Sequence, residues 1–147
     1  GSKQYVTDHV NEHNSLQWRR RRCYNHIEGT MEKAENYLSL NNKYLKEAGA
    51  LIDKGDYVQA SEKFWGAAAE MVKAVAAKRG SELRSHGELY GFVTKLSKEL
   101  NERGLIRLFG LASALHQNFY ENWLSPEMVV DYGEAVKELV GYLRKVA

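Results

Sequence analysis

His116 is the residue whose type and position most directly suggest chemistry. It lies in an apolar stripe, four residues after Ala112 and three residues before Phe119. An imidazole can act as an acid or a base near neutral pH, whereas a polar group on an apolar face needs a partner to offset its desolvation. The spacing favours a histidine at the edge of the core, bonded to a neighbouring helix. A catalytic role is the alternative.

A second candidate site lies where a helix is expected to begin, at Arg84, Ser85 and His86. Unpaired backbone N–H groups and the helix dipole favour an anion at such a position, although helix capping alone explains Ser85. We therefore treat Arg84 and His86 as a candidate phosphate site. Asn118 and Tyr120, close to His116 in the sequence, are further candidates for a phosphate site or a second site.

Four consecutive arginines form a basic cluster, with Trp18 before it and Tyr24 and His26 after it. Guanidinium groups bind phosphates, and aromatic rings stack on bases. The cluster therefore predicts salt-sensitive binding of nucleic acid without sequence preference, and a solvated basic arm without a partner is the alternative. The candidate nucleic-acid-binding residues are Arg19, Arg20, Arg21 and Arg22.

His9, Glu12 and His13 match a short zinc-binding pattern, in which two histidines four residues apart share one helix face. The match lies in a segment without a sustained apolar stripe, and nothing downstream supplies a third ligand. Surface histidines are the better explanation. We predict no metal site and no cofactor.

The charge of the chain is concentrated near its N-terminus. Of 21 basic and 19 acidic residues, residues 1–30 hold five and three, which leaves 16 of each in the remaining chain. The body thus has no overall electrostatic signature for nucleic acid. The single cysteine, Cys23, precludes an intrachain disulfide, and no apolar run approaches the roughly 20 residues of a membrane span. We expect a cytoplasmic protein that does not enter a membrane.

Apolar residues at three- and four-residue steps predict about five helices, and a single proline among 147 residues favours long ones. Asp56, Ser85 and Ser125 are the expected N-caps, and Gly55, Gly80 and Gly104 the expected stops. The third helix is predicted from about His86 to Arg103. We predict an all-α, antiparallel up-and-down bundle over residues 31–147. Residues 1–30 are expected to be a basic N-terminal extension, weakly ordered or partly a tag.

Residues 55–67 also contain part of a tetratricopeptide-repeat pattern, at Gly55-Asp56-Tyr57, Ala60 and Phe64. That pattern encodes a helical hairpin used in peptide binding. The repeat period fails, because Gly91, Thr94 and Lys98 stand 34 residues after Tyr57, Ala60 and Phe64. Ordinary helix packing explains the match better, and a tetratricopeptide-like adaptor remains an alternative.

Residues 44–144 resemble the archaeal PaREP family, which is itself similar to the HEPN superfamily of helical bundles. The matching motifs are Lys54-Gly55-Asp56, the string QASEKFWGAA over residues 59–68, Ser85-His86, and LHQNFYE over residues 115–121. The resemblance implies an HEPN-like fold, often homodimeric. It also implies relatives that are metal-independent RNA-cutting toxins paired with an antitoxin, or nucleotide-linked interaction modules.

Active HEPN members carry an arginine, four variable residues and a histidine. His116 matches the histidine, but Leu111 occupies the arginine position, and Arg107 lies one turn too early. The tyrosine that some toxins carry two residues after the histidine corresponds to Asn118. Cleavage of RNA needs a cation to stabilise the charge on the phosphate, so the resemblance implies a binding function more readily than catalysis.

We therefore predict a binding or interaction module of a nucleic-acid-linked or toxin–antitoxin system, without catalysis. The expected partners are a second copy of the chain, RNA or a nucleotide, and a protein such as an antitoxin or a nucleotidyltransferase. One alternative is a metal-independent endoribonuclease that uses His116, with Arg84 or an arginine of a second subunit in place of the missing arginine.

Overall fold

The computed structural model describes residues 29–147, which form five helices and no strand. The first helix, here called the leading helix, covers residues 29–53. The others are α2 (Tyr57–Lys78), α3 (His86–Glu99), α4 (Gly104–Glu121) and α5 (Pro126–Val146). The predicted all-α bundle is confirmed. The predicted extension lies almost entirely outside the described residues, so the domain boundary at residue 31 stays a prediction.

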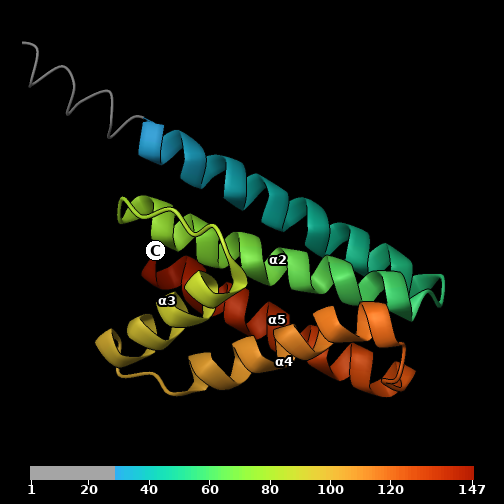
Figure 1. Cartoon of the computed structure of the whole chain (residues 1–147). Helices are drawn as coiled ribbons and strands as arrows, with labels where there is room; N and C mark the ends of the chain where they lie inside the picture. The colour runs from blue at the N-terminus through green and yellow to red at the C-terminus, as the bar shows by residue number, and fades with distance from the viewer. Residues whose placement is uncertain (1–28) are drawn as a thin grey trace, which may run out of the picture.

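Helix α2 is the centre of the bundle. It packs against α3, α4 and α5, while α4 also packs against α3 and α5. The leading helix lies alongside α2 as the other arm of a hairpin (Figure 1). Thirteen of the 22 residues of α2 are buried, many of them alanines, which allows neighbouring helices to approach on several sides. The core draws side chains from all five helices, so it holds them together as one packing unit.

The helix starts follow the predicted caps. The side chain of Asp56 accepts the N–H of Gln59, that of Ser85 accepts the N–H of Glu88, and that of Ser125 accepts the N–H of Met128. Each bond satisfies a backbone donor that the first helical turn leaves without an intrahelical partner. Gly55 and Gly80 have φ angles of 77° and 78°, as expected of left-handed residues after a helix.

The end of α3 differs from the prediction. The helix stops at Glu99, and the left-handed residue after it is Asn101, with a φ angle of 50°. Gly104, predicted to break the helix, is instead the first residue of α4. Asparagine tolerates the left-handed region better than most residues do, so the chain leaves the helix at Asn101, three residues before Gly104.

The loop after α2 determines where the candidate site lies. Residues 79–85 run back along α2, so that α3 begins near the middle of the bundle rather than beyond the end of α2 (Figure 1). This return brings Arg84 and Ser85 over one face of α2. None of the helices in residues 29–147 is long and apolar enough to span a membrane.

Candidate functional site

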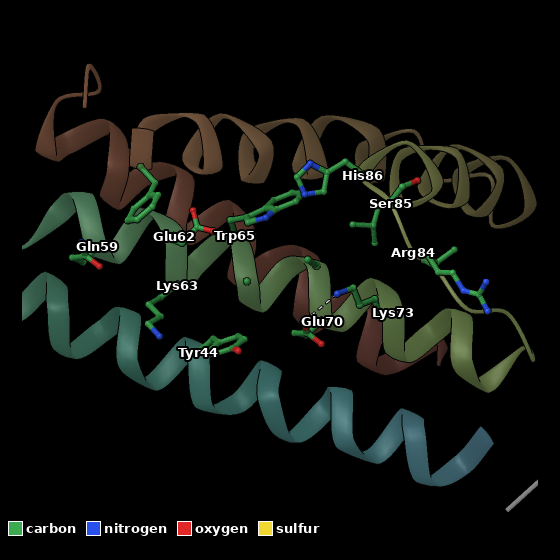
Figure 2. A pocket seen from close by; sticks show the side chains of 15 residues that line it. Tyr44, Gln59, Glu62, Lys63, Trp65, Glu70, Lys73, Arg84, Ser85 and His86 are labelled. Atoms are coloured by element: carbon green, nitrogen blue, oxygen red, sulfur yellow. Dashed lines mark hydrogen bonds and ion pairs between the residues drawn. The ribbon is translucent and has the colours of Figure 1, made fainter. Parts of the chain in front are cut away.

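A groove of about 490 Å³ runs along α2, between the leading helix on one side and the loop and start of α3 on the other (Figure 2). Lining residues outside α2 are Tyr44 of the leading helix, Leu83, Arg84 and Ser85 of the loop, His86 and Leu89 of α3, and Phe119 of α4. The volume lies within the range of small-molecule sites, which span roughly 300–1,000 Å³.

The floor of the groove is one face of α2. Its residues recur at steps of three and four, the spacing that places side chains on a single helix face, and extend over about 21 Å of helix. They are Gln59, Glu62, Lys63, Gly66, Ala69, Glu70 and Lys73. The ring of Tyr44 packs over Gly66, where an added β-carbon would lie 3.0 Å from a ring atom, while charged side chains stand at both ends of the floor. The centre of the groove is therefore apolar and aromatic, and its ends are polar.

His116 lies beside the groove and is fixed by a residue of α2. Its Nδ1 atom is 3.0 Å from Oε2 of Glu62. A carboxylate accepts this hydrogen bond from an Nδ1–H group, and in that tautomer of the neutral ring Nε2 is the acceptor nitrogen. The prediction of a half-buried histidine bonded to a neighbouring helix is confirmed. The same geometry, a carboxylate that orients an imidazole, is also one that general-base catalysis uses.

Aromatic rings connect His116 to the groove. Its ring stacks on Trp65, with centroids 5.0 Å apart and planes 26° apart. The His86 ring is nearly perpendicular to both, with its centroid 5.5 Å from that of Trp65 and 5.1 Å from that of His116. Tyr120 contacts His116 edge-on, at 5.4 Å, and is 70% exposed. The fold thus joins three of the sequence-predicted candidates, His86, His116 and Tyr120, into one cluster.

Two of the three Lys and Arg side chains in the groove have only weak partners. The Nζ atom of Lys73 is 3.4 Å from Glu70, and the exposed guanidinium of Arg84 is 3.3 Å from Glu82. The Arg84 pair is exposed, and such pairs contribute little to stability, so this cation remains available to an anionic ligand. The Lys73 pair is more buried, with side chains 29% and 13% exposed, and its length leaves room for a shorter contact between Lys73 and a ligand.

Lys63, the third cation, is held more firmly. It lies 2.7 Å from Glu47 and 5.0 Å from the centre of the Tyr44 ring. The hydrogen bond from Lys63 lowers the pKa of the Glu47 carboxyl below its ordinary value. Lys63 is therefore engaged within the fold, and the cationic end of the groove is the end formed by Lys73 and Arg84.

Asn118 has a structural role rather than the predicted site role. Its side chain is buried, its amide nitrogen donates to Ser61, and its oxygen accepts the backbone N–H groups of Trp123 and Leu124. These bonds occupy the polar atoms that a phosphate ligand would need, and they tie the end of α4 to the turn before α5.

The position that the HEPN resemblance assigns to an arginine holds Leu111, and Arg107 lies one turn before it on α4. Leu111 is half-buried, and Arg107 is exposed on α4. His116 follows Arg107 by nine positions, which is two and a half helical turns. The two side chains therefore lie on opposite faces of α4. No arginine of α4 in this chain can therefore assist His116. Arg84, which lines the groove, is a candidate cation from another element.

Other predicted residues fall outside the part of the chain described. They are the basic cluster of Arg19, Arg20, Arg21 and Arg22, and the histidine pattern of His9 and His13. Within residues 29–147 no group of three or more His, Cys, Asp or Glu side chains can hold a metal ion. No local pattern marks Glu62, Trp65, Glu70 and Lys73 as site residues, because the face of α2 that they share becomes a groove only when the loop of residues 79–85 and α3 pack beside it.

The fold and the groove define an all-helical domain with a polar site of ligand-binding size. The chain belongs to the archaeal PaREP1/PaREP8 family, whose sequence profile matches residues 36–140. A protein of Sulfolobus solfataricus with a solved crystal structure is similar to it, with a TM-score of 0.64 and 27% identity, over 72% of this chain and 94% of that one. No protein with a curated description matches the chain.

Proposed function

We propose that this domain is an HEPN-like binding module that takes a nucleotide, free or as part of RNA, in the groove along α2. The observation that carries the proposal is the presence of two cations, Lys73 and Arg84, in a groove that aromatic side chains also line. Phosphates bind to Lys and Arg, and planar bases pack on flat surfaces bordered by aromatic rings.

Further features of the groove support an anionic ligand. Arg84 and Ser85 immediately precede α3, and the start of a helix attracts negative charge. The aromatic side chains of Tyr44, Trp65 and Phe119 supply the apolar walls. The basic cluster of residues 19–22, predicted to contact phosphates, would extend the same preference for nucleic acid.

The double variant Lys73→Ala/Arg84→Ala is expected to bind 5′-AMP and a labelled oligoadenylate about 10-fold more weakly or worse, because each charged contact to a phosphate is lost. Isothermal titration measures AMP, and fluorescence anisotropy measures the oligoadenylate. If only the oligoadenylate binds, the natural ligand is RNA. If AMP binds as well, the groove accepts a free nucleotide.

A matched control is Arg107→Ala/Lys137→Ala, which removes the same two charges from exposed positions of α4 and α5. This variant should bind as the unaltered protein does, because neither residue lines the groove. An equal loss in both double variants would mean that net charge, not the groove, controls binding. Absence of binding of either probe to the unaltered protein would refute the proposal.

A metal-independent ribonuclease is the second candidate, and the bond between Glu62 and His116 favours it. In that mechanism Nε2 of His116 removes the proton of a ribose 2′-hydroxyl, and the oxygen attacks the neighbouring phosphorus. The bond from phosphorus to the 5′-oxygen of the next nucleotide breaks, a 2′,3′-cyclic phosphate forms, and the 5′-oxygen leaves as a hydroxyl with a proton from water. The charge that builds on the phosphate then needs a cation, and Leu111 cannot supply one. The binding proposal therefore expects labelled RNA to remain intact in excess chelator. Cleavage that His116→Ala abolishes would make the domain an enzyme.

A further inference from the structure

Tyr120 is an exposed aromatic residue at the edge of the ring cluster beside the groove. It is 70% exposed, and the centre of its ring lies 5.4 Å from that of His116 and 5.1 Å from that of Phe119, which lines the groove. Both of these rings are nearly perpendicular to the Tyr120 ring, at 87° and 80°, so neither lies flat against it. The two contacts therefore orient the ring and leave most of its surface open to solvent.

The packing of α4 against α2 determines the end of the groove at which Tyr120 lies. Phe109, in the first half of α4, contacts Trp65 of α2. Asn118, near the end of α4, donates to Ser61, four residues earlier in α2. The two helices therefore run in opposite directions, as Figure 1 also shows, and Tyr120 lies level with the first turn of α2.

The cations available to a ligand lie at the other end of the groove. Figure 2 shows Lys73 and Arg84 there, with Glu62 toward the end that Tyr120 borders. At a rise of about 1.5 Å per residue, Glu62 and Lys73 are about 16 Å apart along α2, and Tyr120 lies beyond Glu62. A single nucleotide whose phosphate contacts Lys73 and Arg84 is too short to place its base on Tyr120.

We propose that Tyr120 is a stacking platform for a second base, so that the groove holds a short single strand rather than one nucleotide. The proposal rests on the proposed function of the groove as a nucleotide site. Lys73 and Arg84 contact a phosphate at one end, and the Tyr120 ring packs against a base further along the strand. A ring that is already oriented loses little conformational freedom on binding, and stacking of this kind accepts any base.

Strand length tests the proposal in the unaltered protein. Oligoadenylates long enough to reach both ends of the groove should bind about 10-fold more tightly than AMP, because the second base adds a stacking contact. Fluorescence anisotropy of a labelled long strand, displaced by AMP or by unlabelled oligoadenylates of increasing length, places these affinities on one scale. An affinity that does not rise with length would overturn the proposal and leave the nucleotide site intact. If neither AMP nor any oligoadenylate binds, the proposed function fails with it.

Variants of Tyr120 assign the gain to its ring rather than to the additional phosphates. Tyr120→Ala should lower the affinity of the long strand about 10-fold and leave that of AMP unchanged, whereas Tyr120→Phe keeps the ring and should bind both normally. Far-ultraviolet circular dichroism checks that each variant is folded.

Trp123→Ala is the matched control, because it removes another exposed aromatic side chain, on the turn after α4. This variant should bind the long strand as the unaltered protein does. An equal loss in Trp123→Ala and Tyr120→Ala would contradict the assignment to Tyr120, and so would a Tyr120→Ala protein that binds the long strand normally.

Discussion

Replacing Asn118 with leucine is expected to lower the free energy of unfolding by about 2–4 kcal/mol, because two backbone N–H groups and one hydroxyl lose their hydrogen bonds to this side chain. The oxygen of Asn118 accepts the N–H groups of Trp123 and Leu124 at 2.9 and 2.8 Å, and its nitrogen donates to Ser61 at 3.0 Å. A leucine fills a similar space but can neither accept nor donate.

The loss should concentrate at the junction of α4 and α5. Asn122, the C-cap residue of α4, adopts the left-handed region with a φ angle of 51°. The backbone N–H groups of the two residues after it donate to the side chain of Asn118. Asn118→Asp keeps the acceptor for both amides and loses only the donor to Ser61. It should therefore be less destabilising than the leucine variant.

Urea unfolding followed by far-ultraviolet circular dichroism measures these differences. Gln117→Leu is the control, because Gln117 is exposed on the same helix. Surface changes of this kind usually stay within about 0.5 kcal/mol. If Asn118→Leu were as stable as Gln117→Leu, the side chain would not have the structural role assigned to it and would become a candidate for ligand contact again.

Gly133→Ala should destabilise the fold by about 1–3 kcal/mol, since an added methyl group overpacks the core. A β-carbon at Gly133 would lie 2.6 Å from two ring atoms of Phe64, a residue of α2 that is 3% exposed. The ring is enclosed by the core and cannot move away without displacing its neighbours. Close contact between α2 and α5 therefore depends on the absence of a side chain at this position.

The same substitution elsewhere in α5 provides the matched control. Gly141 lies in the same helix and is exposed, and a β-carbon there would meet nothing within 4 Å. Gly141→Ala should raise stability by about 0.5–1 kcal/mol, because alanine loses less backbone entropy in a helix than glycine does. Opposite signs for the two variants in thermal or urea unfolding are the expected result. Equal stabilisation by both would contradict the close approach of Gly133 to Phe64.

Much of the fold was predictable because its signals are local. Asp56, Ser85 and Ser125 act within four residues of the helix starts that they define, and the 3.6-residue period marks each buried face. The end of α3 was misplaced because Gly104 is a stronger sequence signal than Asn101, although the chain turns at Asn101.

The candidate site was only partly predictable, for a physical reason. The apolar context of His116 indicated that it needs a partner, but that partner, Glu62, is 54 residues away in the sequence. Glu70 and Lys73 have the spacing of an ordinary solvated helix pair. Their role in the groove depends on the loop of residues 79–85 returning over α2, and no local pattern encodes that return.

The central claim is that the groove along α2 binds a nucleotide, and a titration of isotope-labelled protein with AMP followed by NMR tests it most directly. The indole N–H of Trp65 and the backbone N–H of Gly66 should shift progressively, because both residues line the groove. The indole signal of Trp123, on the exposed turn after α4, should not move. Shifts confined to Trp18 or Trp123, or no shift at saturating AMP, would contradict the claim.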